Sequence, residues 1–184
     1  PNGTWSKRSC YRHHDATTDP DCIAEMWRLH PGAAVGIPCG PAGIVVIDAD
    51  CHPGRPDGVE AYYACNEGHP VAPHIVVMTP GGGEHHIFRQ RPGDPLGNSR
   101  GSLPAGNDVR GEGGIIVAPG SIRPDGREYS VLNPESGLTL ATTAVIPDHL
   151  FTLIRTPRVS PAADWAGLRP AKGAHLVFSS SDTA

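Results

Sequence analysis

The chain has 184 residues with a formal net charge of −4, and it is rich in Gly (23) and Pro (20) but poor in aromatic residues, at 5%. This length is sufficient for one domain with a substantial core. The many glycines and prolines predict short elements joined by turns. The charge excludes a globally basic surface, so any contact with nucleic acid must come from a local patch.

No apolar stretch approaches the ~20 residues that span a bilayer. The five cysteines are odd in number and form no C-x-x-C pair. This favours reduced thiols over disulfides or a zinc site. We therefore expect a cytoplasmic protein with no membrane partner.

The first predicted helix begins at Asp19, a suitable N-cap, with Pro20 at the first helical position. The segment His30-Pro31-Gly32 ends it. Apolar side chains recur at helical spacing along this helix, and we expect them to pack in the core. These are Ile23, Met26 and Trp27.

Two further helices are predicted. Asp57-Gly-Val-Glu60 resembles a capping box and opens a helix that runs to about Glu67. The segment Ile146–Arg155 is amphipathic, with an apolar face formed by Leu150, Leu153 and Ile154. From residue 156 onward Pro, Ala, Gly and Ser dominate without a sustained period, so we predict a domain over 1–155 and a tail or linker over 156–184.

Runs rich in β-branched residues predict strands between these helices. Residues 91–107 are rich in Gly and Pro and are predicted to form a loop. Helices among strands, followed by a run dominated by strands, indicate an α+β fold. The predicted strands are Ala33–Cys39, Gly43–Asp50, His74–Thr79, Glu84–Gln90, Gly114–Ala118 and Glu128–Leu132.

Two carboxylates close the apolar run that begins at Gly43. Because side chains alternate across a strand, Asp48 and Asp50 point to the same face. Neighbouring carboxylates repel each other unless a positive charge lies between them. Mg²⁺ and Mn²⁺ prefer oxygen ligands and are the natural candidates. The alternative is a strand that runs into an ordinary polar turn.

Two later segments, Gly82–Phe88 and Asn107–Gly114, also place polar side chains beside glycines next to a strand. Glycine permits close backbone approach, and turns of this kind can present N–H groups to phosphate. Each segment also has a simpler interpretation. The glycines fit plain turns, the histidines fit hydrogen-bonded structural residues, and Asp108 with Arg110 fits a solvated ion pair contributing ~0–1 kcal/mol.

In their order along the chain, these motifs resemble the prim-pol family, the N-terminal domain of bifunctional DNA primase/polymerases in the archaeo-eukaryotic primase superfamily. The resemblance covers roughly Asp15 to Arg155. The matching segments are His14–Pro20, Trp27, Pro31–Ile37, Ile44–Asp50, Thr79–Phe88, Asp108–Ser121, Tyr129 and Ile146–Leu150.

The resemblance implies an archaeo-eukaryotic primase-like core, in which an RRM-like half and an N-terminal α/β half carry mixed or antiparallel sheets flanked by helices, with the active site in the cleft. It implies template-directed nucleotidyl transfer from nucleoside triphosphates in DNA replication or repair. The implied partners are a single-stranded DNA template and a primer. Family members are often fused to a helicase, which the Pro/Ala-rich tail would suit.

By motif match, Asp48, Asp50 and Asp108 would hold two Mg²⁺ or Mn²⁺ ions ~3.5–4 Å apart, which activate the attacking 3′-hydroxyl and stabilise the leaving pyrophosphate. His85 matches the histidine that contacts the triphosphate, and His86 is the competing candidate. Alternation places His86 on the face of Phe88 and His85 on the other. If Phe88 packs in the core, His85 faces the cleft.

The resemblance leaves other roles open. Arg110 could clamp phosphate oxygens or form an ion pair that orients Asp108. Gly111, with Gly113 and Gly114, would allow backbone approach to the nucleotide, and Ser121 is a candidate for a sugar or phosphate contact. The template would be gripped by loop arginines, namely Arg89, Arg91 and Arg100.

Two other functions fit the same residues. A metal-dependent phosphohydrolase or nuclease could use the same carboxylates, and a nucleotide- or DNA-binding module could keep the fold without catalysis. Polymerisation predicts extended products, whereas hydrolysis predicts shortened DNA or free nucleotide.

Overall fold

The computed structural model describes residues 9–156, and the predicted tail beyond Thr156 lies outside this range. The fold is α+β, with two antiparallel sheets and three α-helices in the described part of the chain. This confirms the predicted class. Within the same range, no helix has both the length and the apolar character that crossing a membrane requires.

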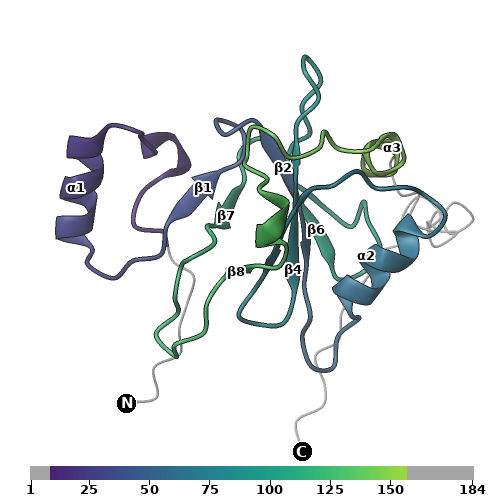
Figure 1. The fold of residues 1–184 in the computed structure, drawn as a ribbon, viewed down its shortest axis with the longest axis horizontal. Helices are drawn as coiled ribbons and strands as arrows, with labels where there is room; N and C mark the ends of the chain where they lie inside the picture. The colour runs from purple at the N-terminus through teal and green to yellow at the C-terminus, as the bar shows by residue number, and fades with distance from the viewer. Residues whose placement is uncertain (1–8, 157–184) are drawn as a thin grey trace, which may run out of the picture.

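Six strands form the main sheet in the order β5-β6-β2-β4-β3-β8, and every neighbouring pair is antiparallel. Strand β2 lies near the middle, with β4 on one side and β6 on the other (Figure 1). Because β2 carries Asp48, its two neighbours determine what lies beside that carboxylate. The strands are β2 (Ile44–Ala49), β3 (Ile75–Met78), β4 (Glu84–Arg89), β5 (Ser99–Arg100), β6 (Asn107–Arg110) and β8 (Ser130–Val131).

A second, two-stranded sheet pairs β1 (Gly36–Pro38) with β7 (Ile115–Val117). It lies between the main sheet and the first helix (Figure 1). Residues of this small sheet pack with one face of β2 to form one hydrophobic core, which includes Ile44, Val46 and Ile116.

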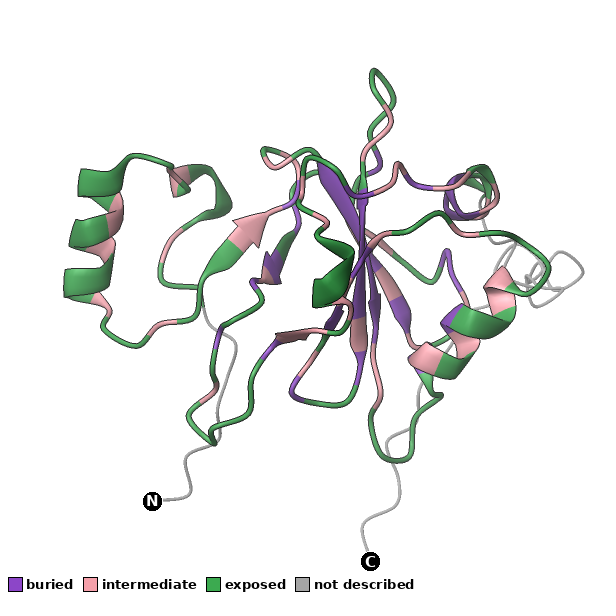
Figure 2. Cartoon of the chain, in the orientation of Figure 1, coloured by how far each residue is buried: buried purple, intermediate pink, exposed green. Residues whose placement is uncertain are grey.

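The opposite face of the main sheet packs against two helices, α2 (Gly58–Asn66) and α3 (Asp148–Arg155). Residues Val45 and Ile47 of β2 belong to this second core. Burial on both faces explains why β2 is an uninterrupted apolar run, and Figure 2 shows the central strand buried along its length. By alternation, Asp48 lies on the face of the small sheet.

The helix boundaries agree with the capping residues. In α1 (Pro20–Leu29) the Asp19 carboxylate accepts from two backbone N–H groups, and in α2 the Asp57 carboxylate does the same. In α3, Leu150 and Ile154 are buried as predicted. Two short 3₁₀ helices, η1 (His13–Asp15) and η2 (Pro134–Ser136), complete the described elements.

The prediction that α1 packs in the core is wrong. No residue of α1 is buried, and Trp27 is 44% exposed. The helix stands at the outer side of the small sheet (Figure 1), and Ile23, Met26 and Trp27 line a cavity instead. Helical spacing shows that a helix has an apolar side, but it does not show what that side faces.

The prediction that residues 91–107 form only a loop is also incomplete. This segment contains β5, and it buries Leu96 and Leu103. The segment that follows, β6, pairs directly with β2. These strands are short and polar, so the pairing of β6 with β2 and of β5 with β6, rather than their own composition, makes them strands.

Candidate active site

Strand register brings three of the predicted site residues together. Asp48 pairs with His85 of β4 on one side and with Asp108 of β6 on the other. Directly paired residues have side chains on one face with Cβ atoms about 4.5–5.5 Å apart. The Nε2 atom of His85 lies 3.4 Å from Oδ1 of Asp48. Residues distant in sequence thus form one polar row across the sheet.

Arg110 supplies a positive charge between the two carboxylates. Its Nη2 atom lies 3.2 Å from Oδ2 of Asp48 and 2.9 Å from Oδ2 of Asp108. The structure therefore contains the ion pair that was one of the two predicted roles of Arg110, and it extends this pair to Asp48. Arg100 adds a longer contact, 3.5 Å from Nε to Oδ2 of Asp108. Two adjacent carboxylates are tolerated here because a cation lies between them.

Asp50 follows the last residue of β2. Strand β2 ends at Ala49, so the strand alternation no longer determines the side to which Asp50 points. Its side chain is 46% exposed, and Oδ1 lies 3.6 Å from Nε2 of His52. In residues 9–156, no three acidic, histidine or cysteine side chains are arranged as metal ligands. The structure brings Asp48 and Asp108 together, and it does not gather Asp50 into a ligand cluster with them.

Two glycines hold the backbone of Asp50, and sequence analysis missed both. The N–H of Asp50 donates to the carbonyl of Gly106, and the carbonyl of Asp50 accepts from the N–H of Gly58, each at 2.8 Å. A Cβ on Gly58 would lie 2.2 Å from the Gly106 oxygen. Only glycine permits this close contact between the two backbones. The sequence did not reveal it because Gly58 resembles an ordinary residue in the first turn of a helix.

The two neighbouring histidines lie on opposite faces, as alternation predicted. Phe88 is buried in the helix-side core with His86, whose ring stacks on Tyr62 with centroids 3.5 Å apart. Burial lowers the pKa of His86 to about 3, so its ring is neutral near pH 7. His85 lies on the Asp48 face and is 2% exposed. Its Nδ1 atom is buried and has no hydrogen-bond partner among residues 9–156.

Gly111 and Ser121 already have structural roles. The N–H of Gly111 donates to Oδ1 of Asn98 at 3.1 Å, and a Cβ at Gly111 would lie 2.0 Å from the carbonyl oxygen of Leu96. The hydroxyl of Ser121 accepts from the N–H of Val35 at 3.3 Å. These contacts explain both residue types without a ligand, and their contacts with a nucleotide stay predictions.

The three arginines proposed to grip a template differ in their surroundings. Arg89 donates to the carbonyl of Thr143, and Arg91 lies 3.8 Å over the Phe151 ring, where it supports α3. Arg100 is 82% exposed beside Asp108. Arg100 alone among these three is both exposed and next to the carboxylates.

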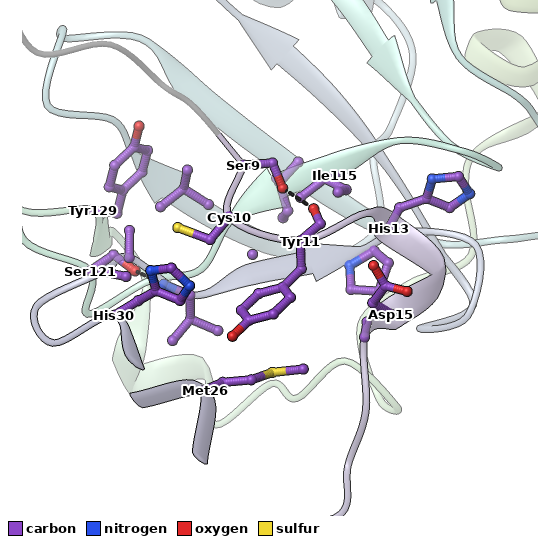
Figure 3. A pocket seen from close by; sticks show the side chains of 18 of the residues that line it. Ser9, Cys10, Tyr11, His13, Asp15, Met26, His30, Ile115, Ser121 and Tyr129 are labelled. Atoms are coloured by element: carbon purple, nitrogen blue, oxygen red, sulfur yellow. Dashed lines mark hydrogen bonds between the residues drawn. The ribbon is translucent and has the colours of Figure 1, made fainter. Parts of the chain in front are cut away.

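A cavity of about 1050 Å³ opens beside the polar row. Asp48, His85 and Arg110 line one part of it, together with Ser121. The opposite part is lined by residues of η1 and α1 (Figure 3). Asp50, Asp108 and Gly111 are not among the lining residues. The cavity thus gives access to Asp48 from the side of the small sheet.

Residues 3–149 match the family model described as bifunctional DNA primase/polymerase, N-terminal. The chain belongs to the prim-pol family. Comparison with the curated proteins and with the solved structures found no match. Membership of this family indicates a nucleotidyltransferase-type enzyme. The two-half architecture, the active-site cleft and the domain limits at 1–155 stay predictions.

Proposed function

We propose that this prim-pol domain is a metal-dependent DNA primase/polymerase that adds nucleotides from nucleoside triphosphates to a strand directed by a single-stranded DNA template. The observation that carries the proposal is the pairing of Asp48 with Asp108 across β2 and β6, with His85 on the other side of Asp48. These residues are the ones that match the acidic and histidine motifs of the prim-pol family.

The donor set fits Mg²⁺ or Mn²⁺. Oδ2 of Asp48 and Oδ2 of Asp108 lie within hydrogen-bond distance of the same Arg110 nitrogen, so a cation can be shared between them. Carboxylate oxygens are the ligands that hard divalent cations prefer. Asp48 and Asp108 would hold the ions, and Asp50 would join them after turning away from His52. When bound, two such ions activate the 3′-hydroxyl and stabilise the leaving pyrophosphate.

The remaining residues would bind and orient the nucleotide. His85 carries a buried Nδ1 atom with no partner in the described part of the chain, next to Asp48. A phosphate oxygen could accept a hydrogen bond from this ring. Arg110, released from the carboxylates when metal binds, could contact the phosphates with two N–H groups. Gly111 and Ser121 would contribute contacts with the phosphates or sugar.

The proposed partners follow from this reaction. They are a single-stranded DNA template, a primer and nucleoside triphosphates, with a fused or separate helicase to expose the template. We place the reaction in DNA replication or repair in the cytoplasm.

The test is incubation with a single-stranded template, Mn²⁺ and labelled nucleotides, with and without a primer. The wild-type protein should lengthen the primer, and Asp48→Asn and Asp108→Asn should each lower the rate at least about 100-fold, the effect of losing about 3 kcal/mol of transition-state stabilisation. Asp94→Asn is the matched control because Asp94 is exposed and pairs with Arg155, away from the carboxylate row.

Retention of extension by both site variants would refute the carboxylate assignment. Shortened DNA or released nucleotide would identify a hydrolase instead. Binding of DNA or nucleotide without any product would identify a non-catalytic module. Circular dichroism and thermal unfolding of each variant show whether it remains folded.

A further inference from the structure

The apolar side of α1 faces the cavity rather than a core. An amphipathic helix ordinarily buries its apolar side against a sheet or another helix. Here Met26 is half-buried, Trp27 is 44% exposed, and both line the cavity. The helix therefore presents large apolar side chains to a space open to a ligand.

Aromatic rings extend this surface. The rings of Tyr11 and His30 meet edge-on, with centroids 5.3 Å apart. Figure 3 shows the Tyr11 ring projecting into the cavity, with Met26 and His30 near its outer end. Flat aromatic faces of this kind are the surfaces on which unpaired nucleobases stack in proteins that bind single strands. We call Tyr11, Met26, Trp27 and His30 the aromatic wall.

Three arginines of residues 9–156 line the cavity, and each lies within salt-bridge distance of an aspartate. Among the described residues that line it, the arginines outnumber the aspartates by three to two, and no glutamate lines it. The arginines are Arg12, Arg110 and Arg123, and the aspartates are Asp15 and Asp48. The phosphates of a bound strand would compete with these carboxylates for the arginine N–H groups, so the aromatic side chains, on which unpaired bases stack, carry the argument for a single-stranded nucleic acid.

The cavity is also continuous with the proposed catalytic site. Asp48 and Arg110 line the same cavity as the aromatic wall. Its volume of about 1050 Å³ slightly exceeds the roughly 300–1,000 Å³ of pockets that enclose one drug-sized ligand. A nucleotide at the carboxylates would therefore leave room beside the wall for a further base.

We propose that Tyr11 and Trp27 stack an unpaired base of a single-stranded nucleic acid as the strand passes Asp48, and that His30 is a positioning residue that holds the Tyr11 ring. The inference rests on the proposed function only in stating that the bound strand passes Asp48. The stacking itself requires only that single strands bind in this cavity.

The test measures the dissociation constant of a fluorescent oligothymidylate by anisotropy, with EDTA and without nucleotides, so that catalysis plays no part. Tyr11→Leu and Trp27→Leu should each weaken binding by about 5- to 100-fold, the loss expected for one stacked base. Tyr11→Phe should bind like the wild-type protein because the ring is retained. Tyr63→Leu is the control, since Tyr63 is 56% exposed on α2, beside the helix-side core.

A second arm uses the same strand with abasic sites. The wild-type protein should prefer the strand that carries bases, and Tyr11→Leu and Trp27→Leu should lose most of this preference. If Tyr11 and Trp27 only stabilised the fold, the Leu variants would bind both strands more weakly to the same degree. His30→Ala should reproduce part of the Tyr11→Leu effect, because it frees the Tyr11 ring.

Equal affinity of the Leu variants and the wild-type protein would overturn the inference, as would failure of the wild-type protein to bind the strand. Weaker binding of nucleotide alone, with unchanged binding of the strand, would overturn it in favour of the incoming nucleotide's base. Failure of the proposed function is distinguishable. Because the anisotropy measurement uses neither nucleotides nor free metal ions, its results hold whether or not primer extension is observed.

Discussion

The buried histidine on the helix side of the sheet should make the protein unfold more easily in acid. His86 is fully buried, stacked on Tyr62, and its Nδ1 atom lies 3.1 Å from Nε2 of His74. Burial, followed by the positive charges of His74 and His85, lowers its pKa from 6.5 to about 3. Glu84 lies 3.0 Å from Nε2 but forms no hydrogen bond with it, so burial outweighs the attraction of this carboxylate.

The sign follows from which state binds the proton. The unfolded chain protonates His86 as the pH falls through 6.5, whereas the folded chain keeps it neutral until about pH 3. The free energy of unfolding therefore decreases as the pH is lowered across this window. Between pH 8 and pH 5 the loss from His86 is about 2 kcal/mol. Burial also lowers the pKa of His74, which adds a loss in the same direction.

The measurement is urea unfolding of the wild-type protein and of His86→Phe at several pH values from 8 to 5. The phenylalanine preserves an aromatic ring against Tyr62 and removes the titrating group. The decrease in unfolding free energy should therefore shrink by about 2 kcal/mol in the variant. His14→Gln, at an exposed position, should follow the wild-type protein. If His86→Phe loses as much stability between pH 8 and pH 5 as the wild-type protein does, the reasoning is wrong.

Two further predictions concern packing. Gly58→Ala should lower the free energy of unfolding by about 1–3 kcal/mol, because its Cβ would lie 2.2 Å from the Gly106 oxygen. Gly81→Ala is the matched control, since its Cβ would meet nothing closer than 3.9 Å, and a similar loss in both variants would contradict the close-approach explanation. Leu150→Ala should cost about 2–5 kcal/mol because Leu150 is fully buried. Leu29→Ala, at a 52% exposed position in α1, should stay within about 0.5 kcal/mol of the wild-type protein in the same urea experiment.

Local chemistry made the helices predictable. Asp19 and Asp57 cap α1 and α2 because a side-chain oxygen satisfies backbone N–H groups that no earlier turn can reach. The central strand was equally clear, since a continuous β-branched run fits a strand buried on both faces. The strand period also placed His85 and His86 on opposite faces. These features depend on residues within a few positions of one another.

The site was only partly predictable for the same reason. Strand alternation placed Asp48 and Asp50 together, but β2 ends between them, and the close approach of Gly58 and Gly106 holds the backbone of Asp50. Arg110 was assigned to Asp108 because the two are near in sequence, and its second partner Asp48 comes from strand pairing. Pairing between strands distant in sequence cannot be recognised from the residue type at either position alone.

The sequence by itself determined the family, the helix N-caps and the acidic and histidine motifs, because each depends on a short contiguous segment. Tertiary structure decided which carboxylates meet, where Arg110 lies, and that the apolar side of α1 turns to a cavity. Those outcomes depend on strand register and on close backbone contacts between distant segments, which amino-acid type and spacing do not encode locally.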